Sequence, residues 1–124
     1  HTLRTMNWLF RHARHLLAAT ACTWKGLVAV TRQEIAFRQE LIVLAAVVPL
    51  GLWLGKTGVS RALLIGSWML VLVVEMLNSA LEATVNRIGP EQHPLSGMAK
   101  DVGSAAVFGA IVLAATVWLL VLCA

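Results

Sequence analysis

The chain has 124 residues, of which 59% are hydrophobic and only 13% are charged, and its formal net charge is +4. Soluble domains average about 45–50% apolar and about 25% charged residues, so this composition excludes an ordinary soluble domain and indicates an integral membrane protein. The length corresponds to a single domain.

Residues of about 5–32 carry the pattern of an amphipathic helix. At 100° per residue, apolar side chains gather in one sector of about 100° and basic side chains lie opposite. The apolar set is Leu9, Ala13, Leu16, Leu17, Thr20 and Trp24, and the basic set is Arg11, Arg14, His15 and Lys25. We expect this helix to lie in the membrane interface; the alternative is a soluble helix packed on a partner. Gly26, a poor helix former, is a candidate break.

Three later segments are apolar enough to cross a bilayer, at about 35–55, 60–87 and 97–123, because a spanning helix needs about 20 residues. The first contains the uncharged run from Leu41 to Gly55, and the last the uncharged run from Val102 to Ala124. The middle segment continues past Glu75 and Glu82 without a helix breaker before Gly89. It is therefore a predicted span that contains carboxylates.

Basic residues predict the orientation of these spans. Six Lys or Arg residues precede the uncharged run of the first span, whereas the loop after this span contains only Lys56 and Arg61, and the next contains Arg87 and Lys100. The positive-inside rule therefore predicts that the N-terminus and the 86–99 loop are cytoplasmic and that the C-terminus is outside.

The stretch GLWLGKT at 51–57 looks like a phosphate-binding P-loop. That motif needs four residues between its two glycines so that backbone N–H groups can wrap a phosphate. Only three residues separate Gly51 from Gly55. The predicted topology also places Lys56 on the outer side, away from cytoplasmic ATP. We therefore expect no phosphate site in this stretch.

A polar stripe runs along the middle span. The stretch EMLNSALEATVNRIG places polar residues at i, i+3, i+4, i+7 and i+11, which share one face of a helix. They are Glu75, Asn78, Ser79, Glu82 and Asn86. Because a charge inside a span costs at least about 2.5–3.5 kcal/mol, such residues predict a functional site; the alternative is a face that only cross-links a bundle by polar contacts.

The two carboxylates of the stripe are predicted to have different roles. Seven residues separate them by about 10 Å along the helix, too far for both to bind one ion directly. Glu82 lies toward the cytoplasm with Glu34, where two carboxylates beside nucleotide phosphates would form a Mg²⁺ site. Glu75 lies deeper in the membrane, where it would act as a general base on a lipid hydroxyl.

The third span opens with the pair Lys100 and Asp101. Lys100 would neutralise phosphate charge, and Asp101 would accept a hydrogen bond from a ribose or base, or orient Lys100. The alternative is an ordinary surface ion pair.

Several stretches resemble, in unbroken order, the prokaryotic integral-membrane diacylglycerol kinase family: WKGL at 24–27, Glu34, AFRQE at 36–40, EMLNSALEATVNRIG at 75–89 and LSGMAKDVGSAAV at 95–107. The resemblance implies an all-α integral membrane fold with three transmembrane helices per protomer and an N-terminal amphipathic interfacial helix. It also implies a homotrimer with shared active sites in the bacterial cytoplasmic (inner) membrane. The implied reaction transfers the γ-phosphoryl of MgATP to 1,2-diacylglycerol, giving phosphatidic acid and ADP.

The resemblance also implies residue roles. Glu75 would be the general base and Asn78 a supporting catalytic residue, while Glu34 and Glu82 would hold Mg²⁺ with ATP. The other nucleotide contacts would be Glu91, His93, Lys100 and Asp101. The lipid site would be lined by Trp24, Ala36, Phe37, Arg38, Gln39, Glu40, Glu75, Ser104 and Trp118. The partners would be diacylglycerol, MgATP and other copies of the chain, with no nucleic acid.

Three positions depart from the family pattern. His15 stands where an arginine is expected near the nucleotide, Cys22 where a tyrosine is expected, and Asn86 where an acidic residue is expected.

Two alternative functions stay open at this stage. Undecaprenol kinases share the carboxylates and the Lys–Asp pair, although KDVGSAAV at 100–107 looks closer to the diacylglycerol branch. The other alternative is a small cation carrier or structural membrane oligomer in which Glu75 and Glu82 line a polar path.

Overall fold

The computed structural model describes residues 2–124, and every regular element in that range is an α-helix. The helices are α1 (Thr2–Gln33), α2 (Ile35–Leu54), α3 (Gly58–Ile88) and α4 (Pro94–Leu122). Residues up to Gln33 form one compact unit and Glu34–Ala124 form a second. Helices α2, α3 and α4 are each long and apolar enough to cross a membrane. The expected all-α fold with three spanning helices is confirmed.

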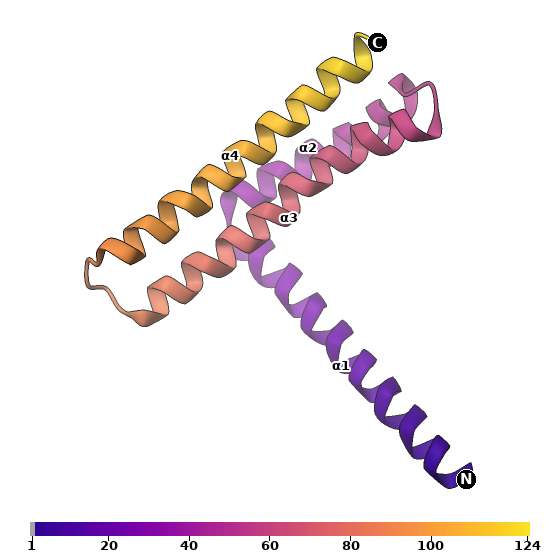
Figure 1. The fold of residues 1–124 in the computed structure, drawn as a ribbon, viewed down its shortest axis with the longest axis vertical. Helices are drawn as coiled ribbons and strands as arrows, with labels where there is room; N and C mark the ends of the chain where they lie inside the picture. The colour runs from indigo at the N-terminus through magenta and orange to yellow at the C-terminus, as the bar shows by residue number, and fades with distance from the viewer. Residues whose placement is uncertain (1) are drawn as a thin grey trace. The chain divides into compact units, whose positions relative to one another are not determined.

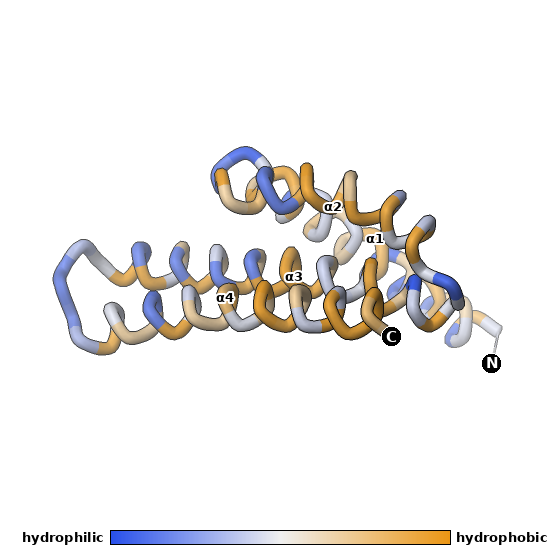
Figure 2. The backbone as a smooth tube through the Cα atoms, turned by 90° about the horizontal axis from the view of Figure 1, so that it is seen from above, coloured by the Kyte–Doolittle hydropathy of each residue, from blue (hydrophilic) through white to orange (hydrophobic). Residues whose placement is uncertain are grey.

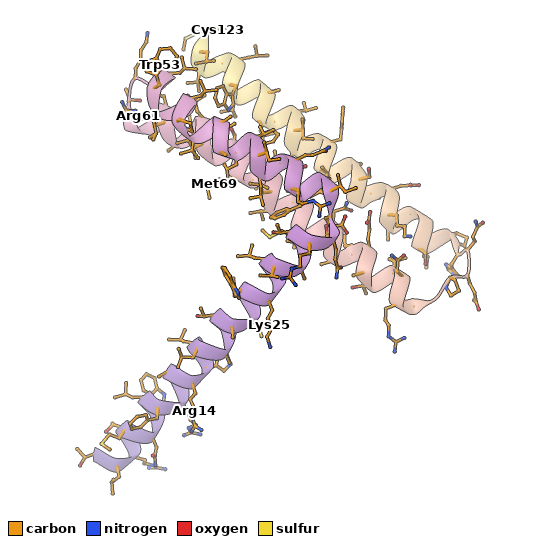
Figure 3. The ribbon with its side chains drawn as sticks, turned by 180° about the vertical axis from the view of Figure 1, so that it is seen from behind. Arg14, Lys25, Trp53, Arg61, Met69 and Cys123 are labelled. Atoms are coloured by element: carbon orange, nitrogen blue, oxygen red, sulfur yellow. The ribbon has the colours of Figure 1, made fainter. Side chains whose placement is uncertain are left out.

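Helix α1 is continuous over 32 residues and none of its residues is buried. It runs straight through Gly26, so the candidate break at this glycine is wrong. One glycine lowers the stability of a helix interior by only about 1 kcal/mol relative to alanine, and the good helix formers on both sides offset this loss. Figure 3 shows the basic side chains Arg14 and Lys25 projecting from this helix.

The second unit is a three-helix bundle in which α3 packs against both α2 and α4 (Figure 1). Its helices begin at strong local signals. Thr57 and Ser60 form a reciprocal capping box at the start of α3, and the Nδ1 atom of His93 accepts a hydrogen bond from the Leu95 N–H at the start of α4. Gly89 follows α3 with a φ of 157°, a backbone conformation that favours glycine. Short connections therefore make sequential helices antiparallel neighbours.

The bundle core lies along one face of α3. Leu64 and Val71 are fully buried, and Val71 packs against Ala110 and Ala114 of α4. Small residues at four-residue spacing let two helices approach closely in an apolar environment. This packing holds α3 and α4 in one register.

The GLWLGKT stretch has a packing role at the end of α2. A side chain at Gly51 would collide with Ile65 of α3. The Gly55 N–H donates to the Gly51 carbonyl, and the Gly55 carbonyl accepts a hydrogen bond from Arg61 Nε at 3.1 Å. These glycines therefore allow α2 to approach α3 and then turn.

Two tryptophans tie the bundle together across helices. Trp68 Nε1 donates to the Glu40 carbonyl at 2.9 Å, linking α3 to α2. Trp118 Nε1 donates to the Leu64 carbonyl at 2.9 Å, linking α4 to α3. Indole N–H groups need such partners where water is scarce.

Replacing Trp68 with Phe is expected to lower the free energy of unfolding by at least about 1 kcal/mol, because it removes one hydrogen bond and replaces the indole with a smaller aromatic ring. Reversible unfolding in mixed micelles measures the change. Trp53→Phe is the control, since Trp53 is 79% exposed. Equal effects of the two substitutions would contradict a specific role for the Trp68 hydrogen bond.

The helices differ in length, and this difference locates the polar end of the bundle. Helix α2 has 20 residues, whereas α3 has 31 and α4 has 29. At about 1.5 Å per residue, α2 matches a hydrocarbon layer of about 30 Å, and α3 and α4 exceed it by about 15 Å. Trp53, Arg61 and Cys123 lie at one common end (Figure 3). The excess therefore projects at the opposite end, where Figure 2 shows the hydrophilic α3–α4 loop.

Candidate active site

The buried face of α3 changes from apolar to acidic partway along the helix. Leu64 and Val71 lead into Glu75, which is only 6% exposed, and Asn78 and Glu82 follow as half-buried residues on the same face. The polar stripe that the sequence predicts thus continues the core of the bundle. From the start of α3, Glu75 lies about 26 Å and Glu82 about 36 Å along the axis.

Glu75 is paired with a second buried acid, Glu40 of α2. Glu40 is 9% exposed, and its carboxyl group lies within hydrogen-bonding reach of the Glu75 carboxyl group. The contact of Trp68 with the Glu40 carbonyl fixes the backbone from which this side chain extends. A hydrogen bond between the two carboxyl groups requires a proton on one of them, so the other carboxyl group remains able to accept a proton. The sequence placed Glu40 in a lipid-lining stretch but carried no sign of this pairing.

Glu34 and Glu82 lie around this pair. Glu34 is the extended residue that precedes α2, and Glu82 lies two turns beyond Glu75 on α3. Both lie near enough to Glu75 for their negative charges to act on its carboxyl group.

The acids fit a magnesium ion that is shared with a nucleotide. Within residues 2–124, no three His, Cys, Asp or Glu side chains come together as a complete metal site. Mg²⁺ commonly takes only one or two carboxylates and fills its octahedron with phosphate oxygens and water. Glu34 and Glu82 are half-buried carboxylates that match this donor set.

A polar pocket of about 660 Å³ lies beyond the acids, at the projecting end of the bundle. Its walls are the end of α3, the 89–93 loop and the start of α4. Its volume is within the range of about 300–1,000 Å³ that small-molecule sites occupy. Of the predicted nucleotide residues, Glu91, His93 and Lys100 line it, whereas Asp101 is exposed next to it in sequence and does not.

Sequence reasoning missed several lining residues of this pocket. Asn86, Gln92 and Ser96 also line it. Lys100 Nζ donates a hydrogen bond to Asn86 Oδ1 at 2.9 Å. The helical stripe pattern had already placed Asn86 at the end of the polar face, and the family resemblance had marked its position as one where an acidic residue is expected.

Asn78 occupies a tight position between α3 and α4. A side chain added at the buried Gly103 would fall on the Asn78 side-chain oxygen. That oxygen is buried and makes no hydrogen bond within residues 2–124. Because Gly103 has no side chain, the Asn78 amide fits between α3 and α4. Asn78 lies one turn from Glu75 on α3.

Replacing Gly103 with Ala is expected to displace Asn78, to cost about 1–3 kcal/mol of stability through overpacking and to lower turnover. Steady-state kinetics and thermal unfolding of the purified protein measure both effects. Gly109→Ala is the matched control on the same helix, because a side chain there would meet no atom within 4 Å. Unchanged turnover in Gly103→Ala would contradict a role for the Asn78 position.

The predicted lipid-site residues are distributed unevenly over the structure. Phe37 is 2% exposed and packs in the bundle, whereas its neighbours Ala36, Arg38 and Gln39 are exposed. Ser104 is exposed about 27 Å from the end of α4, nearly level with Glu75. Trp118 lies only about 6 Å from that end, so one protomer does not bring it to Glu75. Trp24 is exposed on α1, in the other unit.

Three apolar helices with a buried acid pair and a polar pocket at one end define a polytopic α-helical membrane protein with a polar site at the membrane boundary. The prokaryotic diacylglycerol kinase family matches residues 21–122 of this chain. The chain belongs to this family.

Relatives in three bacteria support the assignment over most of the chain. It is 50% identical over 107 residues to the diacylglycerol kinase of Escherichia coli K12, covering 86% of this chain and 88% of the relative. It is 44% identical over 104 residues to that of Haemophilus influenzae, with 84% and 88% coverage. It is 42% identical over 109 residues to that of Pseudomonas aeruginosa, with 88% and 89% coverage.

Proposed function

We propose that this protein is an ATP-dependent lipid kinase that transfers the γ-phosphoryl of MgATP to the hydroxyl of 1,2-diacylglycerol, giving phosphatidic acid and ADP. The observation that carries the proposal is the buried Glu40–Glu75 pair. At about 26 Å along α3, Glu75 lies near the inner boundary of a hydrocarbon layer of about 30 Å. A diacylglycerol hydroxyl resides at that boundary.

Glu75 acts as the general base in this reaction. With the proton of the pair on Glu40, the Glu75 carboxylate would accept the proton of the lipid hydroxyl. The hydroxyl oxygen then forms a bond to the γ-phosphorus as the bond between that phosphorus and the β–γ bridging oxygen breaks, and ADP leaves. Asn78, one turn along the same face, supports the geometry of Glu75.

The nucleotide lies between the acids and the polar pocket. Glu34 and Glu82 would hold Mg²⁺ together with ATP; when bound, this ion neutralises part of the charge on the transferring phosphoryl group. Lys100 and His93 contact the phosphates and ribose from the pocket, with Glu91 also in its wall and Asp101 next to Lys100 in sequence.

Ser104 and Trp118 lie about 21 Å apart along α4, so a lipid whose headgroup lies beside Ser104 would meet Trp118 only with its acyl chains. The proposed assembly is a homotrimer with active sites shared between neighbouring copies. The protein is multi-pass in the bacterial inner membrane, and its N-terminus and α3–α4 loop are cytoplasmic. Helix α1 lies in the membrane interface through its apolar face.

The test is a ³²P-transfer assay in which the purified protein receives MgATP with either diacylglycerol or undecaprenol in mixed micelles. Labelled phosphatidic acid is the expected product. A strong preference for undecaprenol would overturn the lipid assignment. Cation flux in vesicles without any lipid phosphorylation would favour the carrier alternative instead.

A further inference from the structure

A polar contact joins α3 to α4 at the wall of the loop pocket. Lys100 Nζ of α4 donates to Asn86 Oδ1 of α3 at 2.9 Å, and both residues line the 660 Å³ pocket. Fourteen residues separate them in sequence, so the contact depends on the antiparallel register of the two helices. That register is held by the packing of Val71 on Ala110 and Ala114.

The chemistry of the acceptor decides what the contact does to the lysine. A side-chain amide accepts a hydrogen bond and carries no charge, whereas a carboxylate in the same place would form an ion pair. Lys100 is exposed and has a long flexible stem, so without an acceptor its ammonium group would sample many positions. Asn86 therefore restrains the ammonium group and leaves its positive charge uncompensated.

We propose that Asn86 is a positioning residue for the nucleotide: it holds the Lys100 ammonium at the pocket wall and leaves its full charge available to the phosphates of MgATP. This inference rests on the proposed function and makes Asn86 a determinant of the affinity for MgATP. Asn86 acts through Lys100 and takes no part in proton transfer or phosphoryl transfer.

Two substitutions of Asn86 separate its role in positioning the Lys100 ammonium group from the effect of charge at residue 86. Asn86→Asp keeps an acceptor and adds a negative charge beside a bound anion, so it is expected to raise the KM for MgATP by roughly 3–10-fold at low ionic strength and by less at high salt. Asn86→Leu keeps a similar volume and removes the acceptor, so a rise of about threefold is expected. In both variants kcat and the KM for diacylglycerol stay within about twofold, since neither reacting group is touched.

The controls test whether the effect passes through Lys100. Thr84→Asp adds the same charge two residues earlier on α3, outside the pocket wall, and is expected to leave the KM for MgATP near its original value. In a Lys100→Met background, Asn86→Leu loses most of its effect because its partner is absent, whereas Asn86→Asp keeps the part that comes from direct repulsion of the nucleotide. Thermal unfolding of each variant shows whether it is folded.

The outcomes distinguish this inference from the function on which it rests. If Lys100→Met raises the KM for MgATP but the Asn86 variants do not, the positioning role is overturned and the kinase assignment stands. If the Asn86 variants lower kcat and thermal stability together without a selective change in KM, position 86 is structural and the inference fails. If the unaltered protein transfers no phosphoryl group to a lipid, the proposed function itself fails.

Discussion

Replacing Glu75 with Gln is expected to lower the turnover of lipid phosphorylation by about 10²–10⁴-fold, the usual contribution of a positioned general base. The amide has nearly the same shape but cannot take the proton of the lipid hydroxyl. Glu75 lies about 10 Å along α3 from Glu82, so the affinity for MgATP is expected to change by less than about twofold. Single-turnover ³²P transfer measures the chemical step, and equilibrium binding measures the nucleotide affinity.

Two further variants make this result interpretable. Glu75→Asp restores a carboxylate on a shorter stem and is expected to recover part of the turnover. Ser67→Ala removes another buried polar group of the same helix, whose hydroxyl donates to the Leu64 carbonyl, and is expected to keep normal turnover. A Glu75→Gln protein that retained a tenth or more of its turnover would eliminate Glu75 as the base.

Replacing Glu82 with Gln is expected to weaken MgATP binding rather than proton transfer. Loss of even an outer-shell partner of a metal ligand typically costs about 10–100-fold in metal affinity, so loss of a direct carboxylate ligand should cost at least as much. We therefore expect the KM for MgATP to rise by about tenfold or more, with partial recovery of turnover at high Mg²⁺ concentration.

Titration of Mg²⁺ and ATP against the purified Glu82→Gln protein gives the measurement, with Glu82→Asp as the variant that keeps a ligand oxygen. The comparison with Glu75→Gln is decisive. If both substitutions changed nucleotide affinity equally, the division of roles between the two carboxylates would be wrong.

A kinase site without a P-loop is consistent with the physical demands of the reaction. Phosphoryl transfer needs positioning and charge neutralisation and little covalent work from the protein. Carboxylates on α2 and α3 and a lysine on α4 can meet these demands from helices that are rigid within the membrane. The GLWLGKT stretch, by contrast, brings α2 against α3 at the opposite end of the bundle.

The fold was largely predictable because its signals are local. Uncharged runs define the spans, and Gly89 and Pro94 mark the loop between the last two. The 3.6-residue period placed Glu75, Asn78 and Glu82 on one face, and the structure keeps them on the face that packs against other helices. The predicted break at Gly26 was wrong because helix propensity is a weak signal when good helix formers flank a single glycine.

The site was less predictable because its contacts join distant segments. The family resemblance assigned Glu40 to the lipid site, and the sequence carried no sign that its carboxyl group lies against Glu75. Phe37, from the same stretch, packs inside the bundle. A stretch of five residues in a helix covers more than one turn, so its members point in different directions and meet different partners.

The sequence by itself determined that this is a membrane-spanning helical protein with an acidic stripe in its middle span, because hydropathy and helical periodicity are properties of consecutive residues. Only the tertiary structure decided that Glu40 pairs with Glu75, that Gly103 makes room for Asn78 and that Asn86 holds Lys100. Those contacts depend on the register between helices, which is set by how glycine, alanine and valine side chains fit together across the bundle.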